Sequence, residues 1–112
     1  GFINFCRDYA FEYDVVESIN EVILCAGQVY ITVMEDDLLL LLERIRNESL
    51  QLGKEIGIIS YNETPIKRLL FEGIATISTD FEMLGRKAAE LVLSNERNKW
   101  PNPFVFISRA SL

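Results

Sequence analysis

The chain has 112 residues, of which 11 are basic and 17 are acidic, so its formal charge at pH 7 is −6. Hydrophobic residues make up 49% and charged residues 25%, which is typical of a globular domain rather than a disordered tail. The absence of histidine excludes histidine-activated nucleophiles and imidazole metal ligands. The acidic balance argues against nucleic-acid binding by this chain, because that function calls for a basic surface.

The first third of the chain is predicted to contain a helix and two strands. Apolar residues at positions 2, 5, 6 and 9 have helical spacing and predict a helix over residues 1–9. Residues 13–17 are typical of a short strand, and 18–27 favour no single structure. The β-branched run 29–34 predicts a buried strand. Cys6 and Cys25 are too few for a disulfide framework, and we expect both to be small core residues.

The middle of the chain predicts a helix followed by a second buried strand. Glu35, Asp36 and Asp37 favour a helix start, because Asp side chains cap free N–H groups and acidic groups suit the positive end of the helix. The helix is expected to run over residues 37–51 and to stop near Gly53. A strand over 56–61 follows, and the turn-forming run 62–65 ends it.

The last third predicts a loop or single helical turn at 66–72 and a third strand at 74–78. Thr79 and Glu82 fit a capping box, which opens a helix that ends near Ser94. The proline-containing loop 100–103 cannot continue that helix, and a final strand is expected at 104–108.

Strands that alternate with helices predict an α/β fold with a mostly parallel sheet and helices on both faces. A chain that begins directly with an amphipathic helix has no preceding strand to pack it. We therefore expect a part of a larger architecture. The longest apolar run, the five leucines 38–42, falls far short of the roughly 20 residues that a membrane-spanning helix needs, so no membrane partner is predicted.

Polar side chains follow three of the predicted strands. In chain order they are Glu35 and Asp36, Asn62 and Glu63, and Thr79 and Asp80. Parallel strands would bring them to one edge of the sheet, where open α/β sheets bind ligands. Tyr61 and Phe81 add aromatic faces, and this combination suits a neutral polyol or sugar. Each cluster would also serve as a helix cap or a plain turn.

Catalytic and metal chemistry receive less support from the sequence. A hard-cation site at residues 35–37 would need a further ligand group, so no metal is predicted. Paired carboxylates are the remaining catalytic possibility, but no pattern sets two of them at a defined separation. Glycine-rich phosphate loops are absent. We therefore expect neither an enzyme nor a cofactor.

From Leu52 onward the sequence resembles the C-terminal half of the effector domain of LacI/GalR-type transcription regulators. That family has a strand ending in G-[FY]-D-D, an L-T-T-[IV] strand, an L-G-x-x-A helix and a final strand ending in R-x-S. The corresponding segments here are 57–65, 74–81, 84–89 and 108–111. Their order and spacing over about 60 residues carry the resemblance. The sequence of residues 53–65 is most similar to that of sugar-responsive regulators with a GntR-type winged-helix DNA-binding domain.

The resemblance implies a periplasmic-binding-protein-like fold, in which two α/β subdomains enclose a sugar cleft. Residues 1–112 would be the C-terminal part of the effector-binding domain, without the N-terminal subdomain and the DNA-binding domain. The implied function is effector sensing in a cytoplasmic bacterial repressor, where sugar binding in the cleft alters DNA binding by the separate domain. A solute-binding protein of a sugar transport system is the alternative, and the residues upstream of Gly1 would distinguish the two.

Individual residues can be carried over from the family only by position. The family's effector-contacting acid corresponds to Asn62, and its D-F pair near the cleft corresponds to Asp80 and Phe81. Asn62-Glu63 replaces the usual Asp-Asp, and Met34-Glu35-Asp36 replaces A-N-D after the earlier strand.

A homodimer is also implied, because the family dimerises through the segment after the G-[FY]-D-D strand. The apolar residues of that segment here are Ile66, Leu69, Leu70 and Phe71. Contact with a partner or another subdomain would explain them, and so would packing within the monomer.

Overall fold

The computed structural model describes residues 1–95 and 97–112. The helices are α1 (Phe2–Asp8), α2 (Glu35–Asn47) and α3 (Phe81–Ser94), with single 3-10 turns η1 (Ile19–Glu21), η2 (Pro65–Arg68) and η3 (Leu70–Glu72). The strands are β1 (Gln28–Thr32), β2 (Ile56–Tyr61), β3 (Ala75–Thr79) and β4 (Phe104–Ile107). They form one sheet in the order β1-β2-β3-β4, in which the first three strands are parallel and β4 is antiparallel to β3. The predicted α/β fold with a mostly parallel sheet is confirmed.

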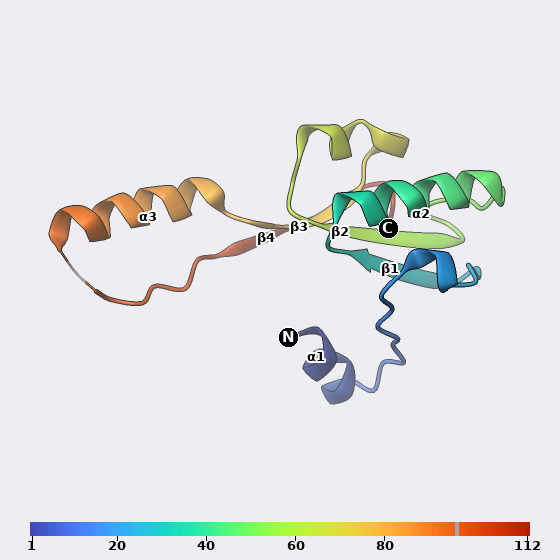
Figure 1. The fold of residues 1–112 in the computed structure, drawn as a ribbon, viewed down its shortest axis with the longest axis horizontal. Coiled ribbons are helices and arrows are strands. Elements are labelled where there is room, and N and C mark those ends of the chain that lie inside the picture. Colours follow the sequence, from blue (N-terminus) through green and yellow to red (C-terminus); the bar gives the residue numbers. More distant parts are fainter. Residues whose placement is uncertain (96) are drawn as a thin grey trace.

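Helix α2 covers one face of the sheet and forms the core with it (Figure 1). Its leucines at positions 38, 41 and 42 and Ile45 recur at helical spacing, so they form one buried face. The other buried members of the cluster are Ile19, Leu24, Ile56, Ile58 and Ile74. The Arg44 guanidinium donates to the carbonyl oxygens of Ile19 and Val22 at 2.5 and 2.7 Å, and thereby fastens η1 to α2.

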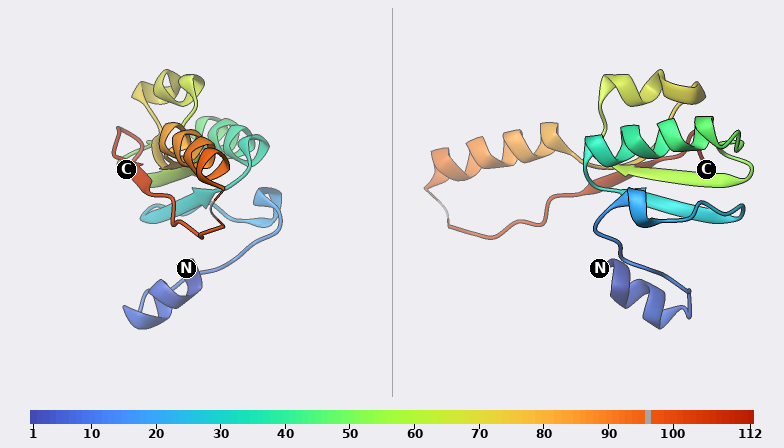
Figure 2. Two further views of the ribbon diagram at one scale, coloured as in Figure 1. Left: turned by 90° about the vertical axis from the view of Figure 1, so that its left-hand side faces the viewer. Right: turned by 45° about the vertical axis from the view of Figure 1, so that its right-hand side comes forward.

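The opposite face of the sheet is largely open within the described residues. Tyr30 packs against the core, whereas its neighbours Val29 and Ile31 point to the other face and are 55% and 46% exposed. Helix α1 stands away from the sheet and does not bury these side chains (Figures 1 and 2). The sheet therefore has a close-packed helix on one face, while the other face has apolar residues in contact with solvent.

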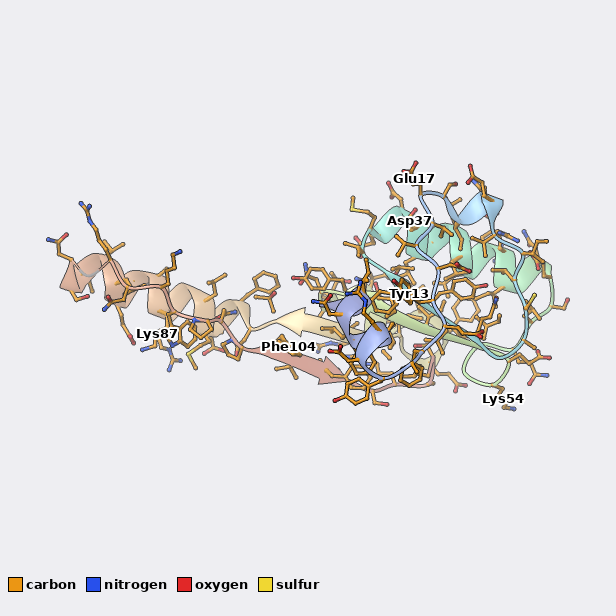
Figure 3. The ribbon with its side chains drawn as sticks, turned by 90° about the horizontal axis from the view of Figure 1, so that it is seen from below. Tyr13, Glu17, Asp37, Lys54, Lys87 and Phe104 are labelled. Atoms are coloured by element: carbon orange, nitrogen blue, oxygen red, sulfur yellow. The ribbon has the colours of Figure 1, made fainter. Side chains whose placement is uncertain are left out.

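Helix α3 and strand β4 form an arm that projects from the body (Figures 1 and 2). None of the helix residues is buried, and all of β4 except Ile107 is exposed. Figure 3 shows Phe104 at the base of this arm and Lys87 farther out along it. The radius of gyration is 17.0 Å, compared with about 13 Å for a compact domain of this length. The arm therefore lacks the packing that the rest of the chain has.

The C-terminal residues that follow β4 make hydrogen bonds to β2 and β3. The Ser111 hydroxyl donates to the Ile58 carbonyl and accepts from the Ala75 N–H, both at 2.7 Å, so it bridges β2 and β3. Gly53 allows the chain end to approach, because a Cβ atom there would lie 1.9 Å from the Ala110 carbonyl oxygen. Its φ of +79° also favours glycine.

Several expectations from the sequence need correction. The strand predicted at 13–17 is absent. Strand β1 lies at the edge of the sheet, so no strand pairs with its outer side, and Tyr13 packs edge-on against Phe2 instead. Cys6 is buried as expected, but Cys25 is exposed in the loop before β1.

The predicted bounds of two helices also shift. Helix α2 begins at Glu35 and ends at Asn47, because Ser49 takes a left-handed conformation and the N–H of Leu50 turns back to the Ile45 carbonyl. The acidic residues occupy its first turn, and no side chain caps it. Helix α3 has its cap one residue later than predicted: the Asp80 carboxylate accepts from the Met83 N–H at 2.8 Å, while Thr79 still belongs to β3.

Candidate functional site

The carboxyl ends of β1, β2 and β3 meet at one edge of the sheet, because these three strands are parallel. Two hydrogen bonds between side chains connect the residues that follow them. Thr64, after β2, donates to the Glu35 carboxylate at the start of α2 at 3.3 Å. The hydroxyl groups of Tyr61 and Thr79 share a hydrogen bond of 3.2 Å between β2 and β3. The three predicted clusters therefore lie together, and we call this edge the strand-end site.

Asn62 occupies the centre of the strand-end site. It follows β2 directly and has a φ of +60°, a conformation that asparagine adopts more readily than most residues. Its N–H donates to the Ile77 carbonyl at 2.8 Å, which ties it to β3. Its side-chain oxygen is buried and has no hydrogen-bond partner among the described residues. An unpaired buried acceptor costs about 1–3 kcal/mol, so a donor supplied by a ligand would stabilise this group.

Glu63 lies in a network that joins three parts of the chain. Its carboxylate accepts two hydrogen bonds from the Arg109 guanidinium, at 2.8 and 2.9 Å. It also accepts from Thr76 of β3 at 2.6 Å and from Arg68 of η2 at 2.8 Å. Both carboxylate oxygens are therefore engaged within the protein, and a direct contact between Glu63 and a ligand stays a prediction.

This network sets the protonation of Glu63. The hydrogen bonds from Arg109 lower the pKa of Glu63 from 4.5 to about 2, and those from Thr76 and Arg68 act in the same direction. Burial works against them, because it disfavours the charged form. The carboxylate is therefore ionised throughout the neutral range, and its charge is balanced by the neighbouring arginines.

Lys67 is buried beneath the end of β2 with only 3% of its surface exposed. Its ammonium group donates to the carbonyl oxygens of Tyr61 and Asn62, both at 2.8 Å. Burial lowers the pKa of Lys67, and the negative charges of Glu35 and Glu63 oppose that decrease. The Lys67 ammonium group thus binds the backbone of Tyr61 and Asn62, the two residues at the centre of the site.

The remaining predicted site residues have different surroundings. Asp80 caps α3, and its carbonyl oxygen accepts from the Asn102 side chain at 3.0 Å. Phe81 is 57% exposed at the start of the arm. Asp36 is exposed in the first turn of α2. No group of three or more acidic or cysteine side chains suited to a metal ion occurs among residues 1–95 and 97–112.

The apolar segment after the site divides into two parts. Ile66, Leu69 and Phe71 are 49%, 79% and 44% exposed, whereas Leu70 packs against the hydrophobic core. Phe71 has a φ of +48° and a ψ of +46°, which is unfavourable for an aromatic residue. Packing within the monomer thus accounts for Leu70 and leaves the other three at the surface.

Sequence reasoning missed Lys67, Arg68, Thr76 and the pairing of Arg109 with Glu63. Lysine is almost never buried unless it is paired, so nothing in residues 65–68 signals that Lys67 lies inside. Arg109 belongs to the R-x-S pattern noted above. Its partner, however, is 46 positions away in the chain, and only the fold brings the two together.

No protein-family model matches the chain, and no curated protein matches it either. The solved structures that are similar to it include two of the lactose repressor. The Lac repressor bound to ONPG in the repressed state superposes with a TM-score of 0.63 and 17% identity, over 78% of this chain and 28% of that one. The lactose repressor bound to the anti-inducer ONPF in the induced state gives a TM-score of 0.62 and 18% identity, over 77% of this chain and 34% of that one.

This likeness shows a fold shared with part of the Lac repressor, a regulator of the LacI/GalR type. The chain spans about a third or less of the length of either neighbour. No helix within the described ranges is long and apolar enough to cross a membrane.

The Glu63 network predicts a specific loss of stability in acid. Because the pKa of Glu63 is about 2 in the folded state and about 4.5 when unfolded, its stabilising contribution is complete above about pH 4.5 and is lost as the pH falls toward 2. We expect Glu63→Gln to cost about 2–3 kcal/mol of unfolding free energy at pH 7, with the difference from wild type shrinking below pH 4.5. Urea denaturation at a series of pH values measures this.

The exposed Glu43→Gln is the matched control and should keep the wild-type pH dependence. A difference between wild type and Glu63→Gln that stays constant from pH 7 to pH 2 would contradict the assigned network.

Proposed function

We propose that the strand-end site binds a small neutral polar molecule, a sugar, and that the chain is the C-terminal subdomain of the sensor of a transcriptional regulator. The observation that carries this proposal is the convergence of Glu35, Tyr61 and Thr79 at the carboxyl ends of the parallel strands β1, β2 and β3. Ligands of open α/β sheets bind at that edge.

The chemistry of the edge favours a sugar. Sugar hydroxyls need several acceptors and donors, and the site offers the Asn62 amide, the Glu35 carboxylate and the Tyr61 hydroxyl. The ring of Tyr61, 41% exposed, and that of Phe81 can pack against the C–H face of a sugar. Arg109 and Arg68 are both paired with the Glu63 carboxylate, so neither arginine calls for an anionic ligand. Asp36 and Asp80 would contribute at its rim.

The second half of the cleft would come from another α/β subdomain. The projecting arm supports this, because Phe81, Val92 and Leu93 are 57%, 81% and 87% exposed and need an apolar surface against them. The Lac repressor structures, to which the fold is similar, contain at least as much additional chain as a second subdomain requires.

Regulation would follow from closure of the two subdomains. A sugar that prefers one arrangement shifts the equilibrium between two states, and that shift would change DNA binding by a separate domain. The sequence of residues 53–65 favours a GntR-type winged helix for that domain. The whole regulator would be cytoplasmic. We propose binding rather than turnover, because Asp80 is engaged as a helix cap and Glu63 in an ion pair.

We further propose that the regulator is a homodimer whose interface includes Ile66, Leu69 and Phe71. These side chains form an exposed apolar patch, and the left-handed Phe71 requires surrounding contacts to stabilise its backbone. Leu70 would support the interface from the core instead of touching the partner.

The first test removes the Asn62 side chain. Asn62→Gly deletes the amide but tolerates the left-handed backbone, so the fold should persist. In the complete protein that contains this chain, we expect affinity for the bound sugar to fall by about two- to tenfold for each lost hydrogen bond, since a hydrogen bond to a neutral group contributes about 0.5–1.5 kcal/mol. Calorimetry with D-galactose, D-glucose, L-arabinose and lactose measures it.

Asn47→Gly makes the same substitution at an exposed position at the end of α2 and should leave affinity unchanged. If Asn62→Gly binds as tightly as wild type, Asn62 is not a ligand contact.

The second test places a charge in the apolar patch. Leu69→Arg should shift the complete protein from dimer to monomer in sedimentation experiments, because a buried charge without a partner opposes association. Ile23→Arg is the control, since Ile23 is 81% exposed and lies outside the patch. A Leu69→Arg protein that remains dimeric would rule out this interface.

A further inference from the structure

We propose that Lys67 is a positioning residue of the strand-end site. Its buried ammonium group holds the carbonyl groups of Tyr61 and Asn62, and thereby fixes the direction in which both side chains face the ligand. This inference rests on the proposed function, because it assigns Lys67 to the same site.

The surroundings of Lys67 are unusual for a lysine. Its side chain is almost completely enclosed, and both carbonyl oxygens lie 2.8 Å from its Nζ atom. Its backbone is anchored as well: the N–H donates to the Thr64 carbonyl at 3.1 Å, and the carbonyl accepts from the Ile74 N–H at 2.8 Å. The ammonium group therefore has a fixed position relative to both β2 and β3.

The peptide that Lys67 holds is the one that turns the chain at the site. Asn62 leaves β2 in a left-handed conformation, and its N–H is bound to Ile77 on the opposite side. Lys67 holds the two carbonyl groups on either side of that N–H. Without the ammonium group, both carbonyls would lose their partners and the peptide could rotate. The Asn62 amide would then point elsewhere.

Stability alone does not account for a buried lysine. Taking an ammonium group out of water costs several kcal/mol, and apolar side chains of similar volume often stabilise a fold as well or better. An apolar residue at this position would, however, leave the direction of the Asn62 peptide unfixed. The charged donor therefore fits a role in orienting the site.

The experiment compares Lys67→Met with Lys67→Arg in the complete protein. Methionine keeps much of the side-chain volume but removes the donors, whereas arginine retains them. Lys54→Met, at an exposed position, is the control for loss of a lysine. The readouts are the NMR signals of the backbone and side-chain amides of residues 61–63 without ligand, and calorimetric affinity for the same four sugars.

We expect Lys67→Met to shift or broaden the Asn62 amide signals and to lower sugar affinity. In metal sites, removing a residue that orients a ligand side chain typically lowers affinity about 10- to 100-fold. By analogy, we expect the loss of the Lys67 ammonium group to lower sugar affinity roughly tenfold. Lys67→Arg should retain most of the affinity, and Lys54→Met all of it. A folded Lys67→Met protein with unchanged Asn62 signals overturns the inference.

The two proposals fail in different ways. If none of the four sugars binds wild type, the choice of ligand fails, while the amide signals still decide the role of Lys67. If Lys67→Met does not fold, the wild-type protein and Lys67→Arg decide. A backbone amide at Asn62 with an order parameter near 0.85 in both supports the inference, and a value below about 0.6 in wild type overturns it.

Discussion

The ion pair between Glu63 and Arg109 is the contact on which the strand-end site depends. One carboxylate receives hydrogen bonds from η2, from β3 and from the C-terminal segment. Parallel strands need long connections, and nothing in their own pairing fixes the chain that leaves them. The Glu63 network supplies that constraint, so the turn at Asn62 has a defined position between neighbouring strand ends.

Only the part of the fold around α2 is well packed, and the strand-end site lies in that part, whereas the arm lies outside it. Around α2, the leucines, Ile45 and the isoleucines of β2 form a continuous core that holds the strand ends rigidly. The arm has no such support, although α3 has 14 residues and isolated helices of that length are only marginally stable in water. The same chain thus combines a well-packed strand edge with an exposed apolar surface on the arm. The cleft that we propose between two subdomains would need both features.

Much of the fold could be predicted from local patterns, because periodicity and β-branching are local properties. The strand 56–61 and the end of α3 at Ser94 match the prediction, and the parallel order explains why the polar strand ends meet. The strand at 13–17 was wrong because a strand requires a neighbour with which to pair, and residue type cannot supply one. The helix cap at Asp80 instead of Thr79 depended on where β3 ends. For the candidate site, the sequence placed Tyr61 and Asn62 at the end of a strand, where the structure has them. It could not indicate the burial of Lys67 or the pairing of Arg109 with Glu63, since burial and long-range pairing arise from tertiary structure.

The central claim is that the carboxyl ends of β1, β2 and β3 form one wall of a sugar site. The most direct measurement is a crystal structure of the complete protein with the sugar that stabilises it most in a thermal-shift screen. The account predicts sugar density within hydrogen-bond distance of the Asn62 amide, against the ring of Tyr61, with the arm packed on a second subdomain. A sugar bound with no atom near these strand ends would contradict it.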